Sequence, residues 1–176
     1  MKTFWQLDMA AKAPHWVALE SWPGPERMLA VAGALDGSFY LFSGVRLKAG
    51  PQGKAVREYL RDAYCFTPGQ GWRRLADLPR AAAAAPSPAA AAGDALLLFS
   101  GDDGTKVDFR PLDKHPGFVR GVLAYHPRSD TWSEAGAAPF SLAVAPTVSW
   151  LGQLVIANGE ARPRVRTPAV WSLKLQ

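Results

Sequence analysis

The stretch Phe39–Gly44, with the sequence FYLFSG, sets the architecture because it recurs twice along the chain. The other two copies are Leu96–Gly101 (LLLFSG) and Leu154–Gly159 (LVIANG). Each is a run of four apolar residues that closes on a small polar residue and a glycine, and the closing glycines lie 57 and 58 residues apart. Self-similarity at a fixed spacing is the signature of a repeat architecture, so the chain is predicted to consist of similar structural units.

A turn signal lies just upstream of each of these runs. The three signals are Asp36-Gly37, Gly93-Asp94 and Leu151-Gly152. Glycine supplies the positive φ that a two-residue hairpin connection requires, so each run is expected to be the second strand of a β-hairpin.

A series of tryptophans follows the same period. Two of them come after further short runs that end in Phe66-Thr67-Pro68 and Tyr125-His126-Pro127, and the members are Trp16, Trp72 and Trp132, spaced 56 and 60 residues apart. Four short strands per unit, with a glycine turn and a periodic tryptophan, are typical of a β-propeller blade. We expect these tryptophans to pack between neighbouring sheets.

Naming the strands of a blade a to d from axis to rim, the chain is predicted to run c-d, a-b-c-d, a-b-c-d, a-b-c. That makes thirteen strands, about three blades, with the last strand over Ala169–Leu175. The sequence thus predicts an all-β propeller segment in one domain over residues 1–176, with blade repeats at 1–23 (partial), 24–79, 80–139 and 140–176 (partial). Three blades leave an open wedge with two apolar faces, which are unfavourable in water.

The alanine-rich segment Ala81–Leu98 (AAAAAPSPAAAAGDALLL) looks like a linker or a broken helix when taken alone. Its position in the period instead predicts a connection between blades followed by an innermost strand of small side chains.

Composition excludes several classes of protein. The 176 residues are 48% hydrophobic and 20% charged, which suits one domain with a buried core and does not suit a disordered or fibrous chain. No run of about 18 apolar residues is present to span a membrane, so no membrane contact is expected. The net charge of +5 fits an anionic ligand, and the absence of a nucleic-acid-binding motif argues against nucleic acid.

The N-terminal residues show no signal peptide, and the single cysteine, Cys65, cannot form an internal disulfide. Both observations favour the cytoplasm, or the periplasm if the N-terminus is incomplete. No metal or cofactor is expected, because His15, His115 and His126 lie in different structural contexts and form no ligand cluster with the cysteine.

One face of the propeller is expected to bind a ligand. The connections d–a and b–c emerge on the same face, and they contain the long segments Gly44–Tyr59, Gly101–Arg120 and Gly159–Pro168. Functional residues concentrate on loops that a rigid scaffold holds. In the second segment, Asp102 and Asp103 are interpreted as turn-forming residues, and His115 as an ordinary loop residue.

The densest chemistry on that face lies in Asn158–Pro168 (NGEARPRVRTP). Glu160 can exchange a proton with a bound hydroxyl, and Arg166 can hold a carboxylate through two parallel hydrogen bonds. On composition alone, Glu160 could equally pair with Arg162 or Arg164 at the rim of the face.

The periodic strands and tryptophans resemble Kelch repeats. The stretch NGEARPRVRTPAVWSLKL resembles the Asn-Gly-Glu and Arg-Thr segment of the sialic acid mutarotases, also called N-acetylneuraminate epimerases. The resemblance implies half of a six-bladed Kelch-type ring and an enzyme that interconverts the anomers of N-acetylneuraminate, or a related acidic sugar, by acid–base ring opening. It also implies that Glu160 is the proton acceptor and Arg166 its functional partner, with Arg27, Asn158 and Arg164 as substrate-binding residues.

The sequence leaves other functions open. The chain could be a non-catalytic Kelch module that binds a protein or a glycan, or an inactive half-propeller fragment. A homodimer of two three-bladed units could close the ring, although one strand per chain would then be redundant. An enzyme requires Glu160 and Arg166 to converge on one pocket near the axis, whereas a binding module does not.

Overall fold

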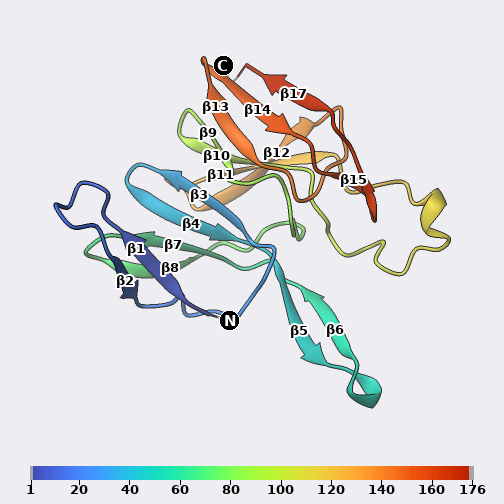
Figure 1. The fold of residues 1–176 in the computed structure, drawn as a ribbon, viewed down its shortest axis with the longest axis horizontal. Helices are drawn as coiled ribbons and strands as arrows, with labels where there is room; N and C mark the ends of the chain where they lie inside the picture. The colour runs from blue at the N-terminus through green and yellow to red at the C-terminus, as the bar shows by residue number, and fades with distance from the viewer. Residues whose placement is uncertain (1, 175–176) are drawn as a thin grey trace.

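The computed structural model describes residues 2–174, which form antiparallel β-strands and two short 3₁₀ turns (Figure 1). Thirteen of the strands make four successive sheets with the orders β1-β2, β3-β4-β7-β8, β9-β10-β11-β12 and β13-β14-β17. The predicted all-β class and the order c-d, a-b-c-d, a-b-c-d, a-b-c are therefore confirmed. The strands are β1 (Phe4–Leu7), β2 (Trp16–Leu19), β3 (Val31–Leu35), β4 (Ser38–Phe42), β7 (Ala63–Thr67), β8 (Gly71–Leu75), β9 (Ala90–Ala92), β10 (Ala95–Phe99), β11 (Gly121–His126), β12 (Thr131–Ala137), β13 (Thr147–Trp150), β14 (Gln153–Ala157) and β17 (Val170–Leu173).

The last predicted strand, Ala169–Leu175, corresponds to β17, and Leu175 lies outside the described residues. Within residues 2–174, no helix is long and apolar enough to cross a membrane.

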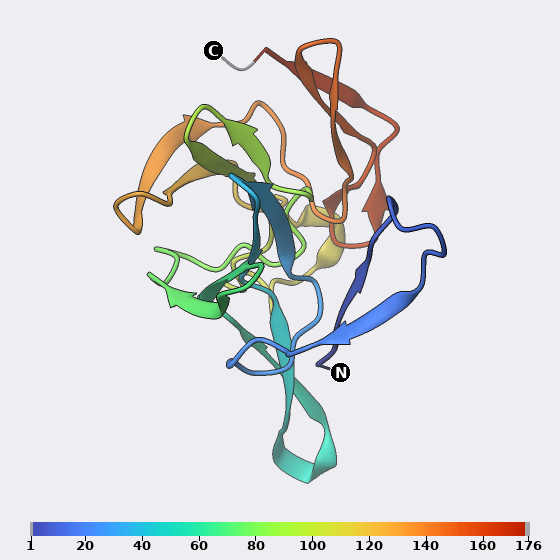
Figure 2. The ribbon, with the colours of Figure 1, turned by 90° about the vertical axis from the view of Figure 1, so that its left-hand side faces the viewer.

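Four further strands lie in two segments that were expected to be loops. β5 (Val45–Ala49) pairs with β6 (Ala55–Tyr59), and β15 (Glu160–Arg162) pairs with β16 (Val165–Arg166). The hairpin β5–β6 projects away from the four sheets (Figures 1 and 2). Sequence reasoning missed both hairpins because β5–β6 carries charges at both faces and β15–β16 is very short.

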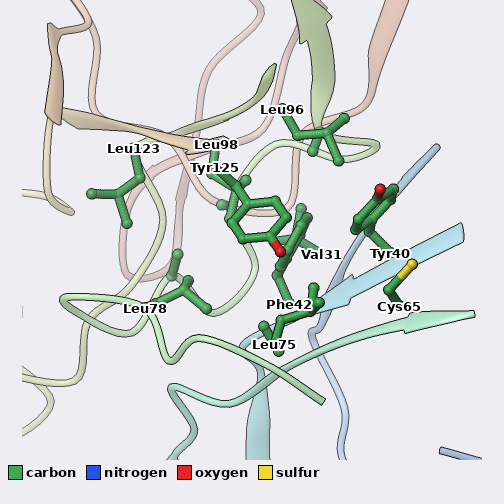
Figure 3. Packing of buried hydrophobic residues seen from close by; sticks show 14 residues of the cluster. Val31, Tyr40, Phe42, Cys65, Leu75, Leu78, Leu96, Leu98, Leu123 and Tyr125 are labelled. Carbon is green, nitrogen blue, oxygen red and sulfur yellow. The ribbon is translucent and has the colours of Figure 1, made fainter. Parts of the chain in front are cut away.

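The main core lies between the second and third sheets (Figure 3). Large side chains from both sheets meet there, with Phe42 and Tyr40 of β4 packed against Tyr125 of β11. Small residues complete it, since the buried alanines Ala82, Ala85 and Ala89 belong to the same cluster. The alanine-rich segment is thus a connection leading to the innermost strand β9, as predicted.

Two buried serines link neighbouring sheets. Ser43 Oγ donates to the carbonyl of Leu60 and accepts the backbone N–H of Ala82 in the next repeat, both at 2.8 Å. Ser100 Oγ accepts the backbone N–H of Leu142, also at 2.8 Å. We call Ser43 and Ser100 the blade-linking serines.

The periodic tryptophans also connect sheets. The indole of Trp72 donates to the carbonyl of Glu20, and that of Trp132 donates to the carbonyl of Ala76, at 2.7 and 3.0 Å. The expected packing between sheets is therefore confirmed for these two. It is wrong for Trp16, whose side chain is 64% exposed. Trp72 and Trp132 each contact the sheet before their own, and the described residues include no sheet before that of Trp16.

The sheets do not close into a ring, and apolar side chains are exposed at both ends of the series. Trp16 and Val17 are exposed on β2, and Val148, Trp150 and Val170 are exposed on the last sheet. The described chain is thus a partial propeller with two uncovered apolar faces.

Candidate active site

A pocket of about 310 Å³ lies where the three long segments meet. Each segment contributes to its wall, and the polar side chains are Arg57 and Tyr59 from β6, Asp102 from the second segment, and Glu160 and Arg164 from the third. This volume is at the small end of the range of about 300–1,000 Å³ that is usual for small-molecule sites. The pocket can therefore hold a ligand about the size of a monosaccharide.

Backbone hydrogen bonds to a neighbouring segment fix the position of Glu160. Glu160 and Ala143 exchange both of their backbone hydrogen bonds, at 2.8 and 2.9 Å, in an isolated antiparallel bridge. Gly159, with φ of 108°, precedes it, and a Cβ there would come within 3.0 Å of the Ala143 carbonyl. Glycine is needed for this close approach, which places the Glu160 side chain at the pocket wall.

The Glu160 carboxylate has two partners within its own hairpin. Oε1 accepts the backbone N–H of Arg164 at 2.5 Å, and Oε2 lies 3.8 Å from the Arg166 guanidinium. The Glu160 side chain is 19% exposed and that of Arg166 is 65% exposed. The side-chain ion pair is thus with Arg166, whereas Arg162 donates to the carbonyl of Asp113. Glu160 is held in place yet remains reachable from the pocket.

Arg166 and Asn158 line an adjoining, more open hollow of about 500 Å³. Val144 lines both hollows, so the two are neighbours along one wall. The structure thus brings four of the five residues expected from the sequence to one region: Glu160 and Arg164 in the pocket, Asn158 and Arg166 beside it.

Arg27 lies elsewhere, in a buried cluster. Its guanidinium donates to both oxygens of Asp62, at 2.9 and 2.6 Å, and to the carbonyl of Ser43 at 2.9 Å. The Arg27 side chain is 1% exposed, and Tyr64 donates a further hydrogen bond to Asp62. A guanidinium enclosed in this way has no free pair of donors for a substrate carboxylate, so the structure does not bring Arg27 to the pocket.

Sequence reasoning missed Tyr59 and Arg57 and interpreted Asp102 only as a turn residue. The Tyr59 hydroxyl donates to Asp102 Oδ2 at 2.7 Å, and Asp102 Oδ1 accepts the backbone N–H of Gly104 at 3.0 Å. Burial, followed by the hydrogen bond to Asp102, raises the pKa of Tyr59 to about 12, while the neighbouring Arg57 acts in the opposite direction. The only sequence signal for Asp102 was its place two residues after a blade-linking serine.

The remaining polar loop residues have local roles. His115 is buried, accepts the backbone N–H of Gly117 and packs against Phe109. Asp103 accepts the backbone N–H of Thr105, as expected of a turn residue. Within the described part of the chain, no group of three or more His, Cys, Asp or Glu residues is arranged to hold a metal ion.

Comparison with known proteins confirms the resemblance inferred from the motif, although no protein-family model matches the chain. The chain is 30% identical over 200 aligned residues to N-acetylneuraminate epimerase of Yersinia enterocolitica, an alignment that covers 99% of this chain and 50% of that protein. It is 29% identical over 192 residues to the protein of the same name in Haemophilus influenzae, covering 93% of this chain and 49% of that one. The chain thus spans about half the length of the curated relatives that it matches.

The fold also has a close counterpart among solved structures. The structure of YjhT matches with a TM-score of 0.83 and 24% sequence identity, over 99% of this chain and 56% of that chain. Together with the order of the four sheets, this match confirms the predicted fold class of a partial β-propeller.

Proposed function

We propose that this chain carries the acid–base site of a mutarotase that interconverts the anomers of N-acetylneuraminate or a related acidic sugar. One observation carries the proposal: the Glu160 carboxylate lies at the wall of the pocket, fixed by its hairpin and accompanied by arginines. The names of the relatives support this substrate class, and the geometry of the pocket supports a role for these side chains.

In the proposed reaction, Glu160 removes the proton of the anomeric hydroxyl. The bond between the anomeric carbon and the ring oxygen breaks, the carbonyl of the open keto acid forms, and the ring oxygen takes up a proton from water. On reclosure this proton returns to water, and Glu160 gives its proton back to the carbonyl oxygen. Rotation of the open chain and reclosure on the other face of the carbonyl produce the second anomer. Positioned proton transfer contributes about 10²–10⁴-fold to such a step, which suits a reaction that already proceeds slowly in water.

The arginines on the side of Glu160 hold the acidic group of the sugar in this proposal. Arg164 lines the pocket and Arg166 lies 3.8 Å from Glu160, while Asn158 in the adjoining hollow offers an amide to a sugar hydroxyl. Guanidinium groups bind carboxylates through two parallel hydrogen bonds. Arg27 takes no direct part, because Asp62 and the Ser43 carbonyl occupy its donors.

The test is the rate of anomer exchange of N-acetylneuraminate, measured by NMR with wild type and Glu160→Gln. The amide keeps the shape of the side chain and removes the proton acceptor, so we expect exchange to fall to the uncatalysed rate while the sugar still binds. Glu134→Gln on the exposed part of β12 makes the same chemical change away from the pocket and is expected to retain full activity. A wild-type chain that has its two apolar faces covered by further blades and binds the sugar without accelerating exchange is a binding module, and the proposal is then wrong.

We also propose that the active form includes further blades that cover the two exposed apolar faces. A homodimer could provide them, although each copy would bring one strand more than half of a six-bladed ring requires. The missing blades could instead belong to a longer polypeptide, since the curated relatives are about twice as long as this chain. The solution mass, measured by light scattering with the exchange assay, separates an active dimer from a monomer.

A further inference from the structure

The pocket has a polar arm that the proposed function does not use. It is formed by three side chains, Arg57, Tyr59 and Asp102, which line the pocket together with Glu160. Arg57 and Tyr59 come from the second sheet's connection and Asp102 from the third sheet's connection, whereas Glu160 comes from that of the last sheet. The arm and the Glu160 hairpin are thus separate parts of the pocket wall.

The pleat of the hairpin β5–β6 places Arg57 and Tyr59 on one face. Residues two apart in a strand point to the same side, and Val45, the cross-strand partner of Tyr59, also lines the pocket. The other face holds Glu58, which forms ion pairs with Arg46 and Lys48. The charges on that outer face pair with one another, so Arg57 is the cation that the hairpin directs into the pocket.

Tyr59 is fixed from two sides. Its hydroxyl proton is donated to Asp102 at 2.7 Å, and its ring lies where a side chain at position 104 would be, since a Cβ on Gly104 would come within 2.5 Å of the ring. Because the only proton of the phenol is committed to Asp102, the lone pairs of its oxygen remain available to a donor. Arg57, two residues away on the same face of the hairpin and lining the same pocket, carries the neighbouring donors, and it acts to lower the phenol's pKa.

The charges around the two hollows leave an excess of one positive charge. Arg57, Arg164 and Arg166 stand against Asp102 and Glu160. Both Asp102 oxygens already accept hydrogen bonds, and Glu160 is paired within its own hairpin. A monoanionic ligand would therefore balance the charge, and the exposed guanidinium of Arg57 has donors to offer it.

We propose that Arg57 is a further binding residue for the carboxylate of the substrate, and that Tyr59 and Asp102 are the positioning residues that orient its guanidinium. This inference rests on the proposed function for the identity of the ligand, but it concerns binding and not the rate of ring opening.

The test compares the affinity of the chain for N-acetylneuraminate with its affinity for the methyl ester of the same sugar, by calorimetry. Arg57→Gln is expected to weaken binding of the acid by about tenfold or more and to change binding of the ester by less than about twofold, since a charge-assisted pair is lost only with the acid. Lys54→Gln removes the same charge from the tip of the same hairpin and should leave both affinities unchanged. Arg57→Lys keeps the positive charge but lacks the two parallel N–H donors of a guanidinium. Its affinity for the acid should therefore lie between those of wild type and Arg57→Gln.

The positioning role has its own readout. Tyr59→Phe and Asp102→Asn should each weaken binding of the acid alone, and neither should add to the effect of Arg57→Gln in a double variant, because both act through that guanidinium. Full additivity would show that Tyr59 and Asp102 act independently of Arg57 and would overturn that part of the inference.

The outcomes separate the two proposals. A wild-type chain with both apolar faces covered that binds the acid without accelerating exchange contradicts the proposed function, while selective loss of acid binding in Arg57→Gln still supports the inference. If Arg57→Gln binds the acid as wild type does, or loses acid and ester equally, Arg57 does not bind the carboxylate, whatever the exchange rate. A wild-type chain that binds neither ligand overturns both.

Discussion

Asp102 and Glu160 occupy the same position in successive repeats and line the same pocket. Each follows a residue with left-handed φ and a glycine, Ser100-Gly101 in one case and Asn158-Gly159 in the other. Each also forms an isolated antiparallel bridge to an alanine, Asp102 to Ala83 and Glu160 to Ala143. The same backbone arrangement thus occurs in both repeats and places two carboxylates at one pocket.

The first repeat has the same backbone arrangement, with an apolar side chain in place of the carboxylate. Val45 follows Ser43-Gly44, bridges to Met28 and lines the same pocket. The backbone repeat therefore defines three positions around the pocket, and the identity of the side chain at each decides its chemistry. Of the three, only Glu160 pairs with an arginine of its own hairpin.

Arg166→Ala should change both rate and affinity, in contrast to Arg57→Gln. Removal of a cation 3.8 Å from the Glu160 carboxylate alters the group that is proposed to move the proton, so we expect anomer exchange to slow by about tenfold or more. Binding of an acidic sugar should weaken far more than that of a neutral one, as titrations with both measure. Arg128→Ala, at an exposed turn, is the matched control. Equal weakening for acidic and neutral sugars would contradict a role of Arg166 in holding the carboxylate.

Arg27→Ala should destabilise the fold without a specific effect on substrate. It leaves Asp62 largely buried with Tyr64 as its remaining side-chain partner, and removal of one member of a buried ion pair costs about 3–5 kcal/mol. The free energy of unfolding, measured with urea, should fall by that amount, while the folded fraction binds the sugar normally. A stable Arg27→Ala variant with weakened binding would instead assign Arg27 to the substrate.

Ser43→Ala should reduce stability by about 2–6 kcal/mol. The hydroxyl satisfies the N–H of Ala82 and the carbonyl of Leu60, and each buried group left without a partner costs about 1–3 kcal/mol. Urea unfolding measures the loss. Ser129→Ala, in an exposed turn, is expected to change stability by less than about 0.5 kcal/mol. A cost for Ser43→Ala as small as that of the control would show that water replaces the hydroxyl.

The folded chain should resist tyrosine ionisation until it unfolds at high pH. Burial, with help from neighbouring groups, raises the pKa of Tyr40, Tyr59 and Tyr64 to about 12, and it raises that of Tyr125 as well. A folded-state pKa above the unfolded value of about 10 contributes stability that is complete below pH 10 and is lost as the pH rises toward 12.

Tyrosinate absorbance, recorded with circular dichroism across this range, checks the alkaline prediction. Both signals should change together, whereas the denatured chain should titrate near pH 10. An absorbance rise near pH 10 with the sheet signal intact would show that the tyrosines are accessible in the native state.

The sequence was sufficient for the fold because its signals are local and periodic. Strand–glycine runs such as Phe39–Gly44, and tryptophans that recur at the same spacing, each identify a strand within a repeat. The same periodicity correctly predicted a connection and a strand in Ala81–Leu98, whose composition alone suggests a linker or a broken helix. It failed for Trp16, since exposure depends on a neighbouring sheet and not on the residues around the tryptophan.

The site was only partly predictable from the sequence. Glu160, Arg164, Arg166 and Asn158 lie within one short motif, so a single stretch of sequence reveals them. Arg57, Tyr59 and Asp102 meet only through the arrangement of two connections, and the hydrogen bond between Tyr59 and Asp102 joins residues 43 positions apart. Arg27 shows the converse. The resemblance implied that it binds substrate, and its partner Asp62, 35 positions away, was not visible from the motif.

The blade-linking serines make the stability of each blade depend on the next one. Ser43 lies at the end of a strand in one sheet, yet its hydrogen bond to Ala82 exists only when the following connection is docked. Ser100 has the same dependence on Leu142. Loss of a later blade would remove the backbone N–H partner of the serine in the earlier one and uncover the core between the two sheets, so neighbouring blades are coupled and unfold as a cooperative unit, in contrast to a string of independent modules.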